Sequence, residues 1–288
     1  MRARIATAPA WLAAALVSAN CFAQGWQKEL DTPYVPTPQV VVDRMLDLAQ
    51  LKAGEMVIDL GSGDGRIMIE AAKKYGARGF GVEIDPQLVK LSNEWAVKAG
   101  VADRVKFLQQ DLFKTDFHEA NVLTLYLLPD VNLALRPKIL AELKPGSRVV
   151  SHDYGMGDWR PDTEETIPAP DKKVGARKES QVFLWTVPAK VDGEWRFELS
   201  SGVKSRRTRL VLKQRYQVVS GTVELAGQGN VPLSDGLLRG DELRLMLPAG
   251  AVDRGPVEMV GRATRDTLAG TLRKSGRDLA NWTARRIP

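Results

Sequence analysis

The chain has 288 residues, 44% of them hydrophobic, so it can bury a sizeable core and is expected to form two domains after a leader. Its formal charge of +6 is uneven, because residues 24–189 carry 21 basic and 24 acidic side chains while residues 190–288 are strongly basic. A nucleic-acid groove in the first part is not expected, since phosphate binding needs clustered Lys and Arg. The basic second part is compatible with an anionic partner or with association at a membrane surface.

The N-terminus, residues 1–23, has the pattern of an export signal: a basic start, an apolar stretch and small residues up to Ala23. Cleavage after Ala23 would remove Cys21, the only cysteine, so we expect no disulfide and no metal site. An uncleaved anchor is the alternative, because residues 5–23 are only marginally long enough to span a bilayer. We therefore expect an exported or membrane-anchored protein on the periplasmic side, rather than a cytoplasmic one.

A proline-stiffened segment, Thr32–Pro38, follows the leader and ends at a predicted helix, with Thr37 as its N-cap. Apolar strands then alternate with helical segments, a pattern typical of βαβ units and of a mostly parallel sheet covered on both faces. An irregular segment, 155–178, precedes a strand at 181–187 that we expect to be antiparallel at the sheet edge. The other expected strands are 56–60, 79–83, 104–109, 121–127 and 147–152, and the expected helices are 65–75, 86–99 and 131–143.

The pattern changes at Pro188, beyond which short strands are separated by turn residues and helical periodicity is absent. Seven or eight strands at a spacing of roughly 8–12 residues predict a small antiparallel barrel or sandwich. We therefore expect a leader (1–23), an α/β domain (24–188) and a β-rich domain (189–288). The expected strands of the last domain are 195–199, 207–214, 217–225, 242–247, 257–264, 267–273 and 281–286.

The stretch DLGSGDGR, Asp59–Arg66, joins the first expected strand of the α/β domain to a helix. Its glycines tolerate positive φ and lack a Cβ, so the backbone can turn sharply and approach a ligand closely. Arg66 stands where a dinucleotide-binding turn has its last glycine, and no G-x-x-x-x-G-K-[ST] phosphate loop is present in the sequence. The remaining pattern is that of enzymes that bind S-adenosylmethionine (SAM).

Carboxylates lie at the ends of the first two expected strands and just after the third. In a SAM site, Asp59 would help to hold the ammonium of the methionine moiety, and Glu83 would accept the ribose hydroxyls. Asp111 would accept from the adenine amino group while Leu112 packs on the ring. The alternative for each carboxylate is an ordinary role at a strand end or in a loop, and Asp85 is expected to cap the next helix.

The ends of the fourth and fifth strands carry the candidates for contact with the methyl acceptor. Tyr126 has the apolar body and polar tip needed to shape an entry for a nucleophile, or it is a core tyrosine. His152 or Asp153 would accept a proton or bind the acceptor, although a structural role is common for a lone histidine. Methyl transfer depends mainly on alignment and desolvation, so a stronger base is not required.

The motifs in question are YVPTP (34–38), DLGSGDGR (59–66), GVEIDP (81–86), DLF (111–113), LYLLPDVN (125–132), LKPGSRVVSHD (143–153) and MGDW (156–159). Together they resemble class I SAM-dependent methyltransferases, which implies a Rossmann-like sheet. They are more closely similar to the bacterial relatives of mitochondrial lysine methyltransferases that act on the ATP-synthase c-subunit and the adenine nucleotide translocase. The resemblance covers residues 32–187.

The resemblance implies that the segment Tyr34–Thr37 closes over the cofactor and that residues 126–129 border the acceptor channel. It also implies a protein lysine as methyl acceptor. A small-molecule acceptor stays open, as does an exported non-catalytic protein with an adenosyl-binding pocket or a β-barrel as its working part, because the predicted export and the β-rich domain depart from the eukaryotic enzymes. The expected cofactor-binding residues are Tyr34, Thr37, Asp59, Gly61, Ser62, Gly63, Gly65, Glu83, Ile84, Asp111 and Leu112.

Overall fold

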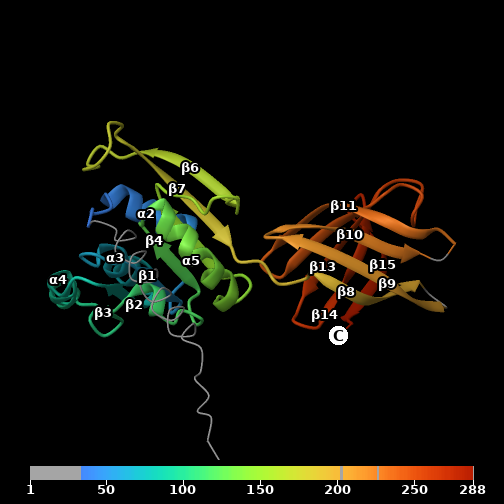
Figure 1. The fold of residues 1–288 in the computed structure, drawn as a ribbon, viewed down its shortest axis with the longest axis horizontal. Helices are drawn as coiled ribbons and strands as arrows, with labels where there is room; N and C mark the ends of the chain where they lie inside the picture. The colour runs from blue at the N-terminus through green and yellow to red at the C-terminus, as the bar shows by residue number, and fades with distance from the viewer. Residues whose placement is uncertain (1–33, 202–203, 226, 288) are drawn as a thin grey trace, which may run out of the picture.

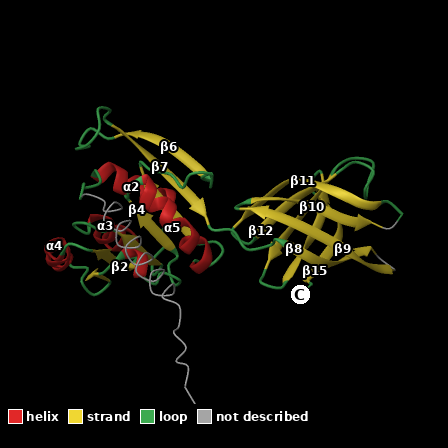
Figure 2. Ribbon diagram, viewed as in Figure 1, coloured by secondary structure: helices red, strands yellow, loops and turns green. Residues whose placement is uncertain are grey.

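The computed structural model describes residues 34–201, 204–225 and 227–287, and the predicted leader lies outside these ranges. An α/β domain and a closed β-barrel follow each other along the chain (Figure 1). Helices occur in the first body, whereas the second is built of strands (Figure 2). Among the described residues, no helix combines the length and the apolar character needed to cross a bilayer.

The α/β domain contains a seven-stranded sheet in the order β3-β2-β1-β4-β5-β7-β6. Strands β1 to β5 run parallel to one another, and β7 is antiparallel to both of its neighbours. This is the Rossmann-like, mostly parallel sheet that the sequence predicts. The strands are β1 (Met56–Leu60), β2 (Arg78–Glu83), β3 (Val105–Gln109), β4 (Val122–Leu125), β5 (Arg148–His152), β6 (Thr163–Pro168) and β7 (Glu179–Thr186).

Helices cover both faces of this sheet because neighbouring strand residues point to opposite sides. Val57 of β1 belongs to an apolar cluster with Val41 and Met68, whereas Ile58 belongs to a second cluster with Leu135. Both faces are therefore buried, which explains why most residues of β1 and β4 are apolar. The helices are α2 (Gln39–Leu48), α3 (Arg66–Tyr75), α4 (Pro86–Lys98), α5 (Pro129–Glu142) and the short 3-10 helix η1 (Leu112–Lys114).

Two sequence-based expectations in this domain were wrong. The segment 155–178 contains β6, and β7 therefore lies between β5 and β6 and does not form the sheet edge. The residues of β6, TEETIP, are mostly polar and alternate between half-buried and exposed, so they lack the apolar run of a buried strand. The N-cap of α2 is Pro38, and Thr37 does not cap the helix with its side chain.

The second body is an up-and-down barrel in which each strand pairs with its chain neighbour and β15 closes on β8. Trp195, Phe197, Met259 and Trp282 are among the buried apolar side chains that fill its interior. The sequence reading omits one strand, β11, whose run is interrupted by Pro232 and by a bulge. The strands are β8 (Gly193–Ser201), β9 (Lys204–Arg215), β10 (Val218–Leu225), β11 (Gly229–Arg239), β12 (Glu242–Leu247), β13 (Val257–Ala263), β14 (Thr267–Lys274) and β15 (Arg277–Arg286).

The barrel attaches next to the amino-terminal end of β5. Gly240 of the barrel packs against Gly146, which precedes β5, and its carbonyl accepts a hydrogen bond of 2.8 Å from the backbone of Ala189. Arg215 and Tyr216 of the barrel both donate to Asp158, at 2.6 and 3.0 Å. The carboxyl ends of the parallel strands lie on the opposite side of the domain from the barrel. Ligands bind at these strand ends in open α/β sheets.

Candidate functional site

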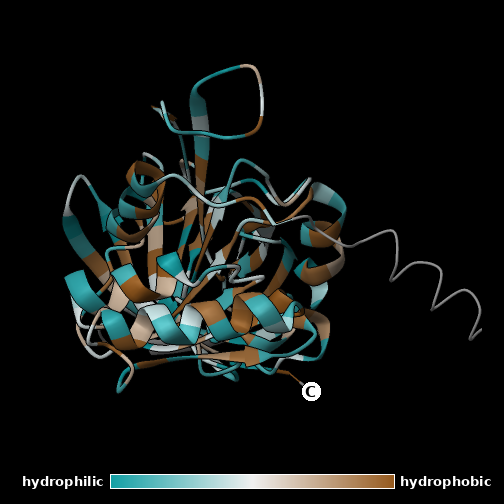
Figure 3. Cartoon of the chain, turned by 90° about the vertical axis from the view of Figure 1, so that its left-hand side faces the viewer, coloured by the Kyte–Doolittle hydropathy of each residue, from teal (hydrophilic) through white to brown (hydrophobic). Residues whose placement is uncertain are grey.

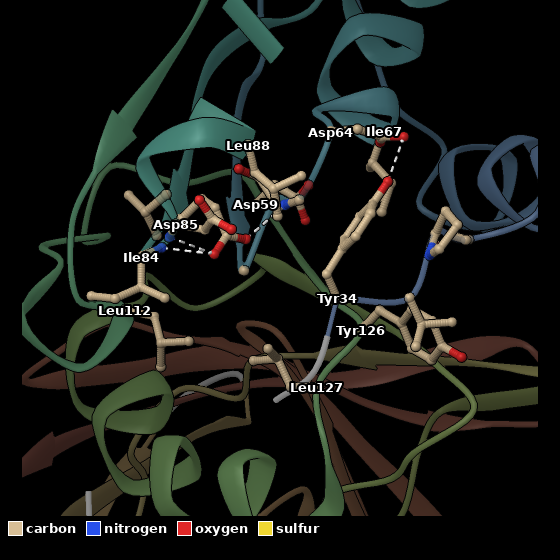
Figure 4. A pocket seen from close by; sticks show the side chains of 18 of the residues that line it. Tyr34, Asp59, Asp64, Ile67, Ile84, Asp85, Leu88, Leu112, Tyr126 and Leu127 are labelled. Atoms are coloured by element: carbon tan, nitrogen blue, oxygen red, sulfur yellow. Dashed lines mark hydrogen bonds between the residues drawn. The ribbon is translucent and has the colours of Figure 1, made fainter. Parts of the chain in front are cut away.

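A pocket of about 430 Å³ lies at the carboxyl ends of β1, β2 and β4. Its lining includes all of the expected cofactor-binding residues except Gly65, and none of the described barrel residues lines it. Figure 4 shows these side chains converging from separate elements. The other lining residues are Val35 and Pro36 of the segment expected to close over the cofactor, and Asp64, Arg66, Ile67, Val82, Asp85, Leu88, Gln110, Phe113, Tyr126 and Leu127.

The glycine-rich turn after β1 forms the floor of the pocket. Gly61, Gly63 and Gly65 have φ values of +73°, +53° and +81°, which other residues adopt only with strain. A Cβ on Gly65 would lie 2.4 Å from the Phe107 ring, so this glycine packs the turn against the sheet and does not face the pocket. Gly63 lies under the ring of Tyr34, where a Cβ would come within 2.7 Å of it.

Glu83 is fixed at the end of β2 by backbone donors. The Gly63 N–H donates to its Oε2 at 2.9 Å, and the N–H groups of Ile84 and Asp85 donate to its Oε1 at 2.8 and 3.1 Å. An ionised carboxylate has about four acceptor positions, so capacity for a ligand hydroxyl remains. The same contacts link the glycine turn to β2.

Asp59 is buried beneath the turn and is only half satisfied. Thr124 donates to its Oδ1 at 2.7 Å, whereas its Oδ2 has no hydrogen-bond partner among the described residues. Burial, opposed by the Thr124 hydrogen bond and aided by the nearby carboxylates of Asp64 and Glu83, raises the pKa of Asp59 to about 7. A buried carboxylate oxygen without a partner fits a cationic ligand group such as the ammonium or sulfonium of SAM.

The strap, residues Tyr34–Thr37, closes one side of the pocket. The Tyr34 hydroxyl donates to Asp64 at 2.9 Å (Figure 4), and Arg66 donates to the Thr37 carbonyl at 2.8 Å. Burial and the Asp64 carboxylate raise the pKa of Tyr34 to about 12. Asp64 and Arg66 thus hold the strap over the glycine turn from the start of α3.

Two further carboxylates end the strands on the adenine side of the predicted site. Asp111 caps η1, since its Oδ1 accepts from the Phe113 N–H at 2.8 Å, and it also faces Lys114 at 3.4 Å. Asp85 caps α4 as expected, accepting from the Gln87 N–H at 2.7 Å. In the described part of the chain, no group of three or more His, Cys, Asp and Glu is arranged to hold a metal ion.

Tyr126 forms the wall of the pocket opposite the carboxyl end of β2 (Figure 4). Its ring contacts that of His152 in a tilted arrangement, with centroids 3.8 Å apart, and its hydroxyl points away from Asp59 (Figure 4). Burial, and then the Asp153 charge, raise the pKa of Tyr126 to about 12, so the side chain stays a neutral phenol. Tyr126 therefore presents an aromatic surface to the pocket.

His152 and Asp153 lie behind this wall and do not line the pocket. His152 is fully buried, its Nε2 lies 2.8 Å from the Ser180 hydroxyl, and burial lowers its pKa to about 4. Asp153 pairs with Lys172 at 2.7 Å. A direct catalytic role of these two residues stays a prediction, and their positions fit support of Tyr126.

Comparison with known proteins identifies a family. The family model of the ANTKMT methyltransferase domain matches residues 59–163. A protein-lysine N-methyltransferase of Saccharolobus islandicus (strain REY15A) is 45% identical over 130 residues, which are 45% of this chain and 81% of that protein. The adenine nucleotide translocase lysine N-methyltransferase of Mus musculus is 38% identical over 133 residues, which are 46% of this chain and 57% of that protein.

A solved structure is also similar to part of the chain. It is an RNA methyltransferase from Salinibacter ruber in complex with S-adenosyl-L-homocysteine (SAH), with 52% sequence identity and a TM-score of 0.49. The match covers 55% of this chain and 96% of that one. The family model and the two relatives confirm the resemblance that the sequence motifs indicate.

Proposed function

Since the chain is a SAM-dependent methyltransferase of the family that contains the protein-lysine N-methyltransferases, we propose that it methylates a lysine side chain of a protein. The observation that carries the proposal is the convergence on one pocket of the cofactor residues expected from the sequence, around the unpartnered Oδ2 of Asp59. The pocket and the family favour an enzyme over a non-catalytic binding protein.

Each part of the cofactor has a matching group in the pocket. Asp59 and Ser62, whose buried hydroxyl also has no partner among the described residues, would hold the ammonium end. Glu83 would accept a ribose hydroxyl, and Ile84 and Leu112 would flank the adenine ring. Bound SAM supplies a methyl group activated by its positively charged sulfur.

The pocket suits a positively charged acceptor that becomes neutral on entry. Asp59, Asp64, Glu83, Asp85 and Asp111 line it, and Arg66, the only basic residue among the described residues that line it, already pairs with Asp64. This negative field attracts a lysine side chain. The aromatic and apolar groups of the wall then exclude water, which lowers the lysine pKa and favours the neutral amine that attacks in line.

The test is methylation of lysine by the purified protein. Incubation with isotope-labelled SAM and lysates of the source cells, followed by acid hydrolysis, would show label in methyllysine. Glu83→Ala is the control, because it removes the ribose acceptor. Label in RNA or in small molecules, with none in methyllysine, would contradict the proposal.

We also propose that the protein acts outside the cytoplasm or anchored to the membrane on its periplasmic side. The support is the sequence pattern of residues 1–23 alone. Cell fractionation with mass spectrometry of the N-terminus tests it. A chain that starts at Gln24 in the periplasmic fraction, or an intact chain in the membrane fraction, agrees with the proposal, whereas an intact chain in the cytosol contradicts it.

A further inference from the structure

The loop between β6 and β7, residues 169–178, is strongly basic. It contains four Lys and Arg side chains and a single acidic one, Asp171. The hairpin extends beyond the rest of the α/β domain, and its loop stands out at the top of the molecule (Figure 1; Figure 3). Lys173, Arg177 and Lys178 are exposed, and Val174 at the tip is 51% exposed.

The base of this loop lies close to Tyr126, which we expect to border the acceptor channel. Lys172 pairs with Asp153 at 2.7 Å, and only 13% of each side chain is exposed. Asp153 directly follows β5 and lies 3.4 Å from Nε2 of His152, whose ring contacts the Tyr126 ring that lines the pocket. The loop therefore lies near the carboxyl ends of the parallel strands, where the pocket is, and close to Tyr126.

The charges at the tip of the loop are available to a partner. Within the described ranges, no carboxylate pairs with Lys173 or Arg177, whereas Lys172 is used by Asp153. Lys178 donates to the backbone carbonyl of Lys172 at 2.7 Å, which fixes the loop but leaves its charge uncompensated. The tip therefore carries a positive field that is not neutralised locally.

The pocket is negatively charged and the loop is positively charged. This arrangement favours some classes of anionic partner over others. Nucleic acid or an anionic lipid surface would suit the loop, but the carboxylates that line the pocket, which include Glu83, Asp85 and Asp111, would repel it. A peptide segment with carboxylates beside a lysine fits both, because its lysine faces the negative pocket and its acidic neighbours face the loop.

From this juxtaposition we propose that the 169–178 loop recognises acidic residues that flank the acceptor lysine in the substrate protein. The inference rests on the proposed lysine methylation and specifies its substrate class. The loop acts on substrate affinity and leaves cofactor binding unchanged, because none of its residues lines the pocket.

The experiment measures peptide binding to the full chain saturated with SAH. Three labelled peptides share one central lysine and differ in its flanking residues, which are Asp and Glu, Ser and Gln, or Lys and Arg. Fluorescence anisotropy gives their dissociation constants for wild type, for K173E/R177E, and for K90E/K98E. The last variant makes the same change in net charge on exposed α4 positions.

We expect wild type and K90E/K98E to bind the acidic peptide roughly fivefold or more tightly than the uncharged one, as two exposed ion pairs would give. K173E/R177E should lose this preference while its affinity for SAH, measured by calorimetry, stays unchanged. Equal binding of the three peptides to wild type would overturn the inference, as would a preference that survives in K173E/R177E. Tighter loop-dependent binding of a single-stranded RNA or of phosphatidylglycerol vesicles would also overturn it.

Methylation of the same peptides with SAM separates the two proposals. Methylation without any preference for acidic flanks contradicts only the role of the loop. Loop-dependent binding of the acidic peptide without methylation of its lysine supports the recognition surface and counts against lysine as the acceptor.

Discussion

The hydroxyl of Thr37 and Nδ1 of His152 lie 3.3 Å apart, and this contact joins the strap over the pocket to the end of β5. The other ring nitrogen of His152 faces Ser180 of β7, and its ring face packs on Tyr126. One buried imidazole thus touches the strap, the Tyr126 ring and the neighbouring strand. Its position suits a residue that orients pocket groups and does not itself contact the substrates.

His152→Asn tests this positioning role. We expect weaker SAH binding by about fivefold, because a buried hydrogen bond to the strap contributes on the order of 1 kcal/mol. The pH dependence of kcat between pH 6.5 and 8.5 should not change, since a pKa of about 4 leaves the ring neutral throughout this range. Calorimetry and pH-rate profiles give both quantities. If the wild-type pH profile of kcat shows an inflection in this range and the variant lacks it, His152 exchanges protons with the substrate.

We expect cofactor binding to depend on pH through Asp59. Its pKa of about 7 in the free protein means that the carboxyl is largely protonated below pH 7, whereas a bound ammonium favours the ionised form. Affinity for SAH should therefore fall as the pH drops below 7, by up to about tenfold per unit, and level off above 8. Calorimetry in buffers with different ionisation enthalpies should detect proton release near pH 6.5. If the affinity for SAH does not change with pH and is the same in wild type and in Asp59→Asn, this assignment is contradicted.

Gly63→Ala should displace the strap. The new Cβ would lie 2.7 Å from the Tyr34 ring on a backbone with φ of +53°, so both contact and conformation are unfavourable. We expect about 1–2 kcal/mol lower stability and at least tenfold weaker SAH binding. In Tyr34→Ala the ring is absent, so adding Gly63→Ala should weaken binding less than it does in wild type. Additive effects on binding, determined by a double-mutant cycle, would show that the two residues do not interact.

Asp158 should control the junction of the domains and not the pocket. Hydrogen bonds from Arg215 and then Tyr216 lower its pKa to about 2, so it accepts from the barrel at any pH where the protein is handled. Asp158→Ala should increase proteolytic cleavage near residues 187–192 and leave SAH affinity within twofold of wild type, because the pocket is at the opposite sheet edge. A large loss of SAH affinity in the folded variant would show that the junction and the pocket are coupled.

Local patterns explain which parts of the fold could be predicted. The glycine turn after β1 and the carboxylates at Asp59, Glu83 and Asp111 follow directly from strand, turn and helix signals in one short stretch each. The barrel follows from the regular spacing of its strands, although β11 was omitted because Pro232 and a bulge interrupt its alternation. Strand β6 was omitted for a related reason, since an edge strand does not require apolar residues.

Contacts between distant segments could not be read from the sequence. The bond between Tyr34 and Asp64 spans 30 residues, and that between Thr37 and His152 spans 115. No local pattern indicates that Asp64 and Arg66 hold the strap. Likewise, a histidine at a strand end gives no sign of whether it faces the pocket or, as His152 does, is enclosed behind a tyrosine ring.

The most direct test of the account is calorimetric titration of the full chain with SAH, in wild type and in Glu83→Ala. The account expects one site per chain in wild type and an affinity lower by roughly 10- to 100-fold in the variant, since the ribose loses a charged acceptor worth about 1.5–3 kcal/mol. Absence of binding to the folded wild-type chain, or equal affinity in the two proteins, would contradict the central claim that this pocket holds SAM.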